Sequence, residues 1–98
     1  MEPMIINASV QVVPITKAEE AFHIIDQAIA LIQQSGLKYT VGAFATELEG
    51  EYNDVQTLLK QICDFCYGQK EMQFLVYTKL HLSGGQDILA ADKTGKFS

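Results

Sequence analysis

The sequence predicts an α+β domain in which two helices cover one face of a four-stranded antiparallel sheet. Three observations lead to this prediction: four β-rich segments, two segments with apolar residues at helical spacing, and their order, βαββαβ, along the chain. The chain has 98 residues, of which 48% are hydrophobic and 19% are charged, a composition typical of one small globular domain. So short a chain buries a limited core, so association between subunits is expected.

The first strand is predicted over Asn7 to Ile15, where Pro14 ends the ladder because proline lacks a backbone donor. A helix is predicted to follow, with Thr16 as its N-cap, ending near Gln34 and before Gly36. The apolar stripe expected to face the sheet consists of Phe22, Ile25, Ile29 and Ile32. An adjacent stripe, expected in part to face another subunit, consists of Ile24, Ala28 and Leu31.

The remaining strands and the second helix follow in order. Lys38 to Gly42 and Ala45 to Tyr52 are predicted as two short strands of a hairpin or bent ribbon. Asn53 is a candidate N-cap for a second helix over Asp54 to Tyr67. The longest β-like run, Met72 to Leu82, is predicted as the fourth strand.

These elements place a single ferredoxin-like domain in residues 1–82. Residues 83–98 contain three of the seven glycines and little apolar periodicity, so we expect a tail that is flexible or ordered by a partner subunit. No segment of the chain covers the second face of the predicted sheet, which suits a wet surface or, as we favour, a subunit interface that encloses a ligand. The side chains predicted on that face are Gln11, Val13, Glu47, Glu49, Tyr77 and Lys79.

Composition and charge exclude several classes of function. The net charge is −5 and the pI is about 4.8, and no cluster of lysine or arginine suits a phosphate backbone, so we expect no nucleic-acid partner. No signal peptide pattern and no apolar run long enough for a membrane span are present, which favours a cytoplasmic protein with no membrane partner.

Cys63 and Cys66 form a CxxC pattern, which occurs in redox and metal sites. Redox CxxC motifs normally begin a helix, whereas these cysteines lie late in the second predicted helix, so we expect both to be buried core residues. A zinc site would need two more ligands, and His23 and His81 do not have the required spacing. We therefore predict no metal ligands.

Three carboxylates follow a chain reversal at Gly42 to Ala45. Strand alternation puts Glu47, Glu49 and Glu51 on one face and Thr46 on the other. Such a row can be a solvated edge strand whose charges discourage aggregation. It can equally accept hydrogen bonds from a ligand amino group or offset a ligand cation.

Two segments carry a resemblance to a known family. Ser9 to Ile15 reads SVQVVPI, and Ser35 to Glu51 reads SGLKYTVGAFATELEGE, with a later strand that contains Lys79. This pattern resembles the YkoF-like thiamine-binding protein family. The resemblance implies a ferredoxin-like fold, a homodimer or homotetramer built by sheet packing, and binding of thiamine or its hydroxymethylpyrimidine moiety without turnover. The site residues that it implies are Gln11, Thr46, Glu49 and Lys79.

One stretch departs from the family pattern. After the lysine the family commonly continues into an acidic and arginine-rich stretch, whereas here His81 to Gly85 reads HLSGG. The contribution of that stretch to assembly or binding does not carry over to this chain.

The chemistry of thiamine also suits these residue types. Its cationic thiazolium needs an aromatic face, and its aminopyrimidine needs a carboxylate and a hydroxyl or amide. Phe44 can provide the aromatic face, with Tyr39 and Tyr77 as alternatives. Lys79 is expected to pair with Glu47 or Glu49 or to lie at the subunit interface. The complete predicted ligand-binding set is Gln11, Phe44, Thr46, Glu47, Glu49, Tyr77 and Lys79.

No nucleophile elbow, phosphate-binding glycine loop or dinucleotide fingerprint occurs in the sequence. We therefore predict no catalytic residues, no enzyme activity and no resident cofactor, with thiamine as the candidate ligand. The alternative is an oligomeric scaffold or interaction protein whose open sheet face drives assembly without a small-molecule ligand.

Overall fold

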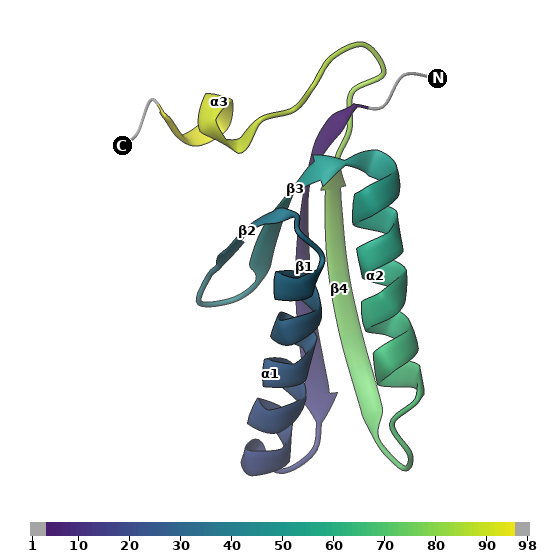
Figure 1. Cartoon of the computed structure of the whole chain (residues 1–98). Coiled ribbons are helices and arrows are strands. Elements are labelled where there is room, and N and C mark those ends of the chain that lie inside the picture. Colours follow the sequence, from purple (N-terminus) through teal and green to yellow (C-terminus); the bar gives the residue numbers. More distant parts are fainter. Residues whose placement is uncertain (1–3, 96–98) are drawn as a thin grey trace.

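A computed structural model describes residues 4–95 and confirms the predicted order of elements (Figure 1). A short helix that the sequence patterns did not predict follows the fourth strand. The elements are β1 (Ile5–Ile15), α1 (Ala18–Gln34), β2 (Lys38–Val41), β3 (Thr46–Glu51), α2 (Tyr52–Tyr67), β4 (Gln73–His81) and α3 (Ala90–Thr94).

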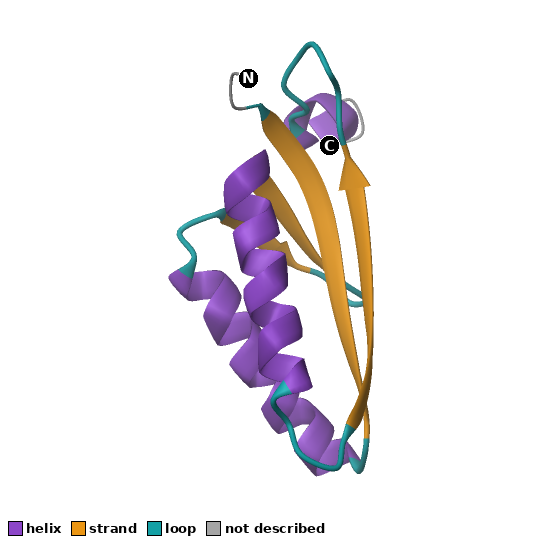
Figure 2. Ribbon diagram, turned by 90° about the vertical axis from the view of Figure 1, so that its right-hand side faces the viewer, coloured by secondary structure: helices purple, strands orange, loops and turns teal. Residues whose placement is uncertain are grey.

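The four strands form one antiparallel sheet in the order β2-β3-β1-β4, which is the predicted ferredoxin-like arrangement. Both α1 and α2 lie on one side of the sheet (Figure 2). β1 is central, and it pairs with β3 over residues 5–10 and with β4 over residues 7–15. The half of β1 that extends beyond β3 is therefore paired on one side only.

The ends of the helices differ from the prediction in small ways. Lys17, not Thr16, is the N-cap residue of α1, and the hydroxyl of Thr16 donates to Glu20 Oε2 at 2.7 Å. α2 follows β3 directly, with Glu51 rather than Asn53 as its N-cap residue. At the end of α1, Gly36 has a φ of 78°, the left-handed conformation that glycine adopts readily when it terminates a helix.

The core lies between the sheet and the two long helices. From α1 it takes Ile24, Ala28 and Ile32, whereas Phe22 is 68% exposed. The predicted facing stripe of α1 was therefore wrong at Phe22, whereas Ile25 and Ile29 are partly buried and Ile32 is buried. The adjacent stripe also faces the sheet, through Ile24 and Ala28. Because the apolar arc of α1 is wide, packing decides which of its side chains face the sheet. The small side chain of Ala28 allows a close approach of helix and sheet. The side chains of the core cluster are Ile6, Ala8, Val10, Ile32, Leu48, Val55, Leu58, Leu59, Ile62 and Cys66.

The two cysteines are both free, but only Cys66 is buried. The prediction that Cys63 is also a core residue was wrong, because the inward face of α2 passes through Leu59, Ile62 and Cys66 and leaves Cys63 on the outer side. Burial, with a smaller contribution from Cys63, raises the pKa of the Cys66 thiol. This setting does not activate a thiolate.

After β4 the chain turns back along one end of the sheet, where α3 lies (Figure 1). Ile88 donates its backbone N–H to the carbonyl of Ile5 at 2.9 Å, and Asp87 Oδ1 accepts from the N–H of Ile5 at 2.9 Å. These contacts join two parts of the same chain. The flexible or partner-ordered state expected for residues 83–98 stays a prediction, and residues 96–98 lie outside the described residues.

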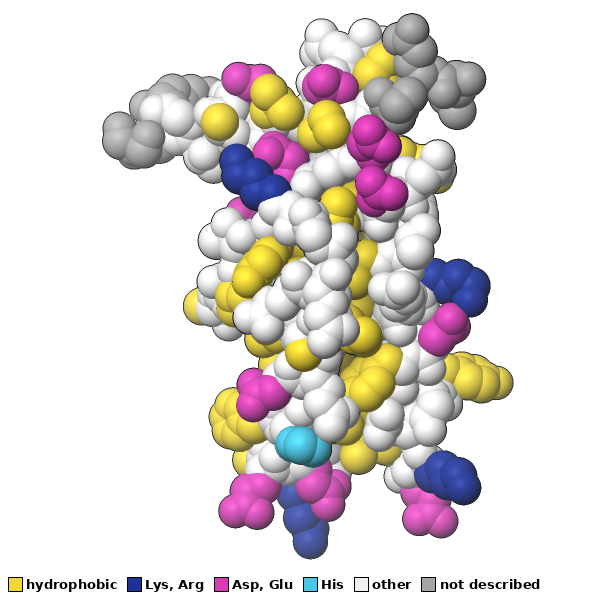
Figure 3. Space-filling view, viewed as in Figure 1, with side chains coloured by type: hydrophobic (Ala, Val, Ile, Leu, Met, Phe, Trp, Pro, Cys, Tyr) yellow, Lys and Arg dark blue, Asp and Glu magenta, His cyan; other side chains and the backbone are white. Residues whose placement is uncertain are grey.

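The helix-covered side carries acidic side chains mainly toward its two ends, with apolar side chains between them (Figure 3). Lysine side chains on this side are scattered. None of the helices formed by residues 4–95 is long and apolar enough to cross a membrane.

Candidate functional site

The uncovered face of the sheet carries polar side chains in two rows that cross all four strands. Because partner residues in a sheet lie side by side on the same face, the register defines both rows. The first row is Lys38, Glu49, Asn7 and His81. The second row is Thr40, Glu47, Ser9 and Lys79.

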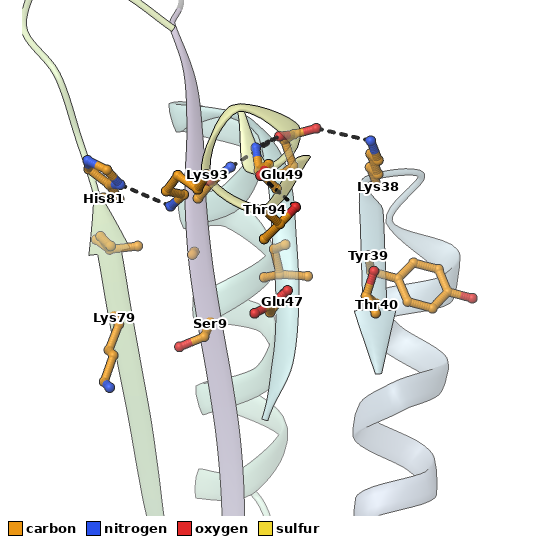
Figure 4. Close-up of a pocket in the computed structure, with 15 residues that line it drawn as sticks. Ser9, Lys38, Tyr39, Thr40, Glu47, Glu49, Lys79, His81, Lys93 and Thr94 are labelled. Atoms are coloured by element: carbon orange, nitrogen blue, oxygen red, sulfur yellow. Dashed lines mark hydrogen bonds and ion pairs between the residues drawn. The ribbon is translucent and has the colours of Figure 1, made fainter. Parts of the chain in front are cut away.

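A cavity of about 300 Å³ lies over these rows, at the lower end of the size range of small-molecule sites. The C-terminal segment forms one wall of the cavity, and Figure 4 shows α3 above the side chains of the second row. From this segment the wall takes Ala90, Lys93 and Thr94. The sheet and the returning chain thus enclose a space that the sheet alone would leave open.

Glu49 is the centre of the first row. Its Oε1 accepts the backbone N–H of Ala90 at 2.6 Å and the amide of Asn7 at 3.2 Å, and its Oε2 lies 3.5 Å from Lys38 Nζ. The hydrogen bond from Ala90 is the largest cause of a pKa of Glu49 below its ordinary value of 4.5; Asn7 and Lys38 lower it further, and burial opposes them. Glu49 is therefore an ionised anchor that fixes the C-terminal segment on the sheet.

Asn7 is a buried polar residue in this row, with 8% of its surface exposed. Its Nδ2 donates to Glu49 Oε1 at 3.2 Å and to the carbonyl of Ile88 at 3.1 Å. Its Oδ1 is buried and has no hydrogen-bond partner among the described residues. Asn7 lines the cavity, but this oxygen is itself covered and does not open into the cavity.

A second contact holds α3 at the other end of the first row. Lys93 Nζ lies 3.0 Å from Nδ1 of His81, and the pair is visible in Figure 4. An ammonium has no acceptor, so Lys93 donates and His81 accepts through an unprotonated Nδ1. Together with Glu49, this contact ties α3 to both β3 and β4.

The second row has no such internal partners. The side chains of Thr40, Glu47, Ser9 and Lys79 make no hydrogen bond or ion pair with any other described residue. They supply one carboxylate, two hydroxyls and one ammonium to the cavity. This row can therefore bind a polar ligand without breaking an existing contact.

The predicted ion pair of Lys79 with Glu47 or Glu49 was wrong. Lys79 lies on β4, and β1 separates it from both glutamates on β3. Neighbouring strands are about 4.8 Å apart, so the two charges start from roughly twice that distance. Lys38 on the adjacent strand β2 takes the position beside Glu49 instead.

The predicted ligand-binding residues divide between two places. Glu47, Glu49 and Lys79 line the cavity on the uncovered face. A second cavity of about 230 Å³, between α1 and the turn that joins β2 to β3, is lined mainly by apolar side chains. The predicted residues that line this second cavity are Gln11, Phe44 and Thr46.

Three of the predicted residues, Thr46, Phe44 and Tyr77, lie outside the cavity on the uncovered face. Thr46 is buried on the helix-facing side of β3, and Phe44 is 85% exposed in the turn. Tyr77 is 55% exposed, pairs with Gln11 across β1 and β4, and lines neither cavity. The structure therefore brings Glu47, Glu49 and Lys79 together but leaves Phe44 and Thr46 on a different side of β3.

Several residues of the cavity were not predicted. For Asn7, Ser9 and Thr40 a signal was present, because strand alternation places them on the same face as Gln11, Glu47 and Glu49. For Lys93 and Thr94 there was none, because their position depends on the return of the C-terminal segment. The unpredicted lining residues with polar side chains are Asn7, Ser9, Lys38, Thr40, His81, Lys93 and Thr94.

Within residues 4–95 no group of three or more histidine, cysteine, aspartate or glutamate side chains is placed to hold a metal ion. The charged groups around the cavity are instead two glutamates, His81 and three lysines. Such a mixture suits an organic ligand with both donors and acceptors.

Comparison with known proteins identifies the family. Residues 8–97 match the model of the thiamine-binding protein family. The chain belongs to this family. The resemblance seen in the sequence up to Lys79 is thereby confirmed, and the family match extends beyond it into the C-terminal segment that forms one wall of the cavity.

Relatives of the family share both length and fold. A UPF0045 protein of Clostridium perfringens is 24% identical over 91 residues, which cover 93% of this chain and 95% of the relative. A DUF77 domain of Bacillus cereus has a solved structure that is 30% identical, with a TM-score of 0.85 over 98% of this chain and 92% of that one. A candidate thiamine biosynthesis/salvage protein of Thermotoga maritima is 26% identical, with a TM-score of 0.84 over 96% and 99% of the two chains.

Proposed function

We propose that this member of the thiamine-binding family binds thiamine, or its hydroxymethylpyrimidine moiety, in the cavity on the uncovered sheet face. The observation that carries the proposal is the second row, whose polar side chains line a cavity of about 300 Å³ and have no partners among residues 4–95. An aminopyrimidine has an N–H donor and ring-nitrogen acceptors. Glu47 matches the donor, and Ser9, Thr40 and Lys79 match the acceptors.

The charges around the cavity favour the neutral pyrimidine over the cationic thiazolium inside it. Glu49 is already paired with Lys38, which leaves Glu47 as the second carboxylate of a cavity that Lys79 and Lys93 also line. A fixed cation would meet two ammonium groups there. We therefore place the pyrimidine in the cavity and the thiazolium outside it.

Tyr77 is the aromatic residue that a thiazolium would meet if it left the cavity along β4. It lies two residues from Lys79 on the same strand face, a separation of about 7 Å. A tyrosine ring attracts a cation over its face. A Tyr77→Leu variant that loses thiamine affinity but keeps its affinity for hydroxymethylpyrimidine would support this placement.

We propose binding without chemical turnover and without a resident cofactor. A general acid needs a carboxyl group that stays protonated near neutral pH. The contacts of Glu49 do the opposite, since they lower its pKa and hold it as an anion. The family name, which describes binding, agrees with this proposal.

We also propose that the protein is a cytoplasmic homodimer or homotetramer that associates through the uncovered sheet face. Beyond the cavity this face exposes apolar side chains on β1 and β4. Ile15 is 53% exposed, Leu75 47% and Tyr77 55%. Apolar side chains that gather on one uncovered sheet face are typical of a subunit interface.

The test is calorimetric titration of the purified protein with thiamine and with hydroxymethylpyrimidine. We expect saturable binding, which Glu47→Gln weakens by about tenfold or more because a charge-assisted hydrogen bond is lost. Glu51→Gln is the matched control, since Glu51 lies on the same strand and face but does not line the cavity. Absence of binding by the folded protein would reject this function and favour the scaffold alternative.

A further inference from the structure

The cavity on the uncovered face gathers positive charge in an acidic protein. Three of the seven basic residues of the chain line it, all of them lysines, against two of the twelve acidic residues. With His81 neutral, the lining side chains carry one positive charge in excess, whereas the whole chain has a net charge of −5. A local charge opposite to that of the protein as a whole attracts ligands of the other sign, which are anions in this case.

The ammonium groups that no carboxylate neutralises lie on one side of the cavity. Lys38, on β2, is paired with Glu49 at 3.5 Å. Lys79 is exposed on β4 and makes no hydrogen bond or ion pair with another residue from 4 to 95. Lys93 of α3 lies 3.0 Å from His81 of the same strand β4. An ammonium has three N–H donors, so two of those of Lys93 remain for a ligand.

Lys79 and Lys93 can reach one group between them. Lys79 and His81 lie two positions apart on the same face of β4, a separation of about 7 Å. Lys79 extends along β4 away from Lys93 (Figure 4), but no described residue holds it there and its four-carbon stem is flexible. Rotation toward Ser9, its partner on β1, lets both ammonium groups contact an anion of the size of phosphate.

The carboxylates lie on the opposite side of the cavity. Glu47 and Glu49 are on β3, and β1 separates them from β4. Neighbouring strands are about 4.8 Å apart, so Glu47 and Lys79 are roughly 10 Å apart across the sheet. The acidic residues of the returning segment, Asp87 and Asp92, do not line the cavity. The cavity therefore has an acceptor side at β3 and a cationic side at β4.

This polarity matches one form of the pyrimidine. Hydroxymethylpyrimidine has its amino and hydroxymethyl groups on adjacent ring carbons, so a ligand whose amino group contacts Glu47 can direct the hydroxymethyl group toward β4. In thiamine the same methylene carbon bears the thiazolium cation, which ammonium groups repel. A phosphate ester at this position instead carries nearly two negative charges at neutral pH and accepts charge-assisted hydrogen bonds from lysine.

We propose that the cavity binds the phosphate monoester of hydroxymethylpyrimidine, with Lys79 and Lys93 on the phosphate and Glu47 on the amino group. This inference rests on the proposed function and specifies the chemical class of the ligand as a phosphorylated pyrimidine. Lys79 then contacts the phosphate in place of a ring nitrogen, which the hydroxyl of Thr40 can still bind. His81 is a positioning residue, because it holds Lys93 at the cationic side.

The experiment compares hydroxymethylpyrimidine with its phosphate monoester. Affinities for both are measured by calorimetry at neutral pH in the wild type, Lys79→Gln, Lys93→Gln and Lys70→Gln. We expect the wild type to prefer the monoester by about tenfold or more, as two charge-assisted hydrogen bonds allow. Lys79→Gln and Lys93→Gln should each reduce this preference by at least about fivefold. In the wild type the preference should also fall as the salt concentration rises.

Lys70→Gln is the matched control. It removes the same charge from an exposed position between α2 and β4 that does not line the cavity, so the preference should be kept. All three substitutions replace an exposed lysine with a polar residue, and circular dichroism verifies that the variants are folded. A preference that is unchanged in both Lys79→Gln and Lys93→Gln would overturn the placement of the phosphate.

The outcomes for the wild type distinguish the two proposals. If hydroxymethylpyrimidine binds as tightly as its monoester or more tightly, this inference is overturned and the binding function remains intact. Inorganic phosphate that binds as tightly as the monoester would also overturn it, because the cavity would then be a general anion site. No affinity for hydroxymethylpyrimidine, its monoester or thiamine would overturn the proposed function and this inference with it.

Discussion

Glu49 shows how a single carboxylate can build a site without being exposed in it. Its two oxygens contact β1, β2 and α3 through Asn7, Lys38 and Ala90, and its side chain is 14% exposed. A carboxylate that accepts a backbone N–H is held in its charged form. The position of the C-terminal segment, which forms one wall of the cavity, therefore depends on the ionisation of Glu49 in the sheet.

The first prediction concerns the response of this wall to acid. The folded-state pKa of Glu49 lies below 4.5, so its stabilising effect is complete above that pH and is lost as the pH falls through the lowered pKa. We expect the hydrogen-exchange protection factor of the Ala90 amide to be constant from neutral pH to about 5 and to fall on further acidification.

Glu49→Gln is the control for this experiment. The neutral amide of glutamine accepts a hydrogen bond more weakly than a carboxylate does. The protection factor of the Ala90 amide should therefore be lower at neutral pH in this variant and should depend little on pH. Asp87 also accepts a backbone hydrogen bond, from Ile5, and the variant leaves this contact in place. A Glu49→Gln variant whose Ala90 amide is as well protected at neutral pH as in the wild type would contradict the role of Glu49.

At the scale of elements, the order of strands and helices could be predicted because each leaves a local pattern. Strand alternation also placed Glu47 and Glu49 on one face correctly. The facing side of α1 could not be predicted, because Ile24 and Ile25 both belong to a continuous apolar arc. Only packing against the sheet selects Ile24 and leaves its neighbour partly exposed.

The site could be predicted only in part for a related reason. The contact of Asn7 with the carbonyl of Ile88 spans 81 positions in sequence, and that of Glu49 with Ala90 spans 41. A short helix such as α3, with five residues, leaves too weak a pattern to be recognised alone. Contacts between such distant segments depend on the folded topology, so α3 and the unpaired acceptor of Asn7 are properties of the structure.

The second prediction tests the packing of α1 with a matched pair of substitutions. Ile32 is 2% exposed and belongs to the core, whereas Ile25 is only partly buried. Ile32→Ala should lower the free energy of unfolding by about 2 to 5 kcal/mol, as expected for a core truncation, and Ile25→Ala by clearly less. Urea unfolding measures both, and equal losses would show that the facing side of the helix is wrongly assigned.

At the scale of the whole molecule, the two faces of the sheet are covered by different parts of the chain. The helices bury one face in the core, and the C-terminal segment covers one end of the other, over the cavity. What remains uncovered is the apolar part of β1 and β4, with Val13 opposite Leu75. A chain with a net charge of −5 has general repulsion between copies, so the association proposed above would depend on such a local apolar surface.

The last prediction concerns this surface. Leu75→Glu should shift the protein toward the monomer in light scattering coupled to size-exclusion chromatography, because it introduces a buried unpaired charge at the contact. Phe22→Glu makes the same change in charge on the opposite side of the molecule, where Phe22 is 68% exposed, and should leave the assembly intact. An unchanged oligomer in Leu75→Glu would contradict association through this face.

The same variant reports whether the cavity is complete in one chain. All the polar side chains of the first and second rows, and the wall formed by α3, come from a single copy. A monomeric Leu75→Glu protein that retains its affinity for hydroxymethylpyrimidine would therefore place the pyrimidine site within one chain. Loss of that affinity on dissociation, with the fold preserved, would mean that the neighbouring copy supplies part of the site.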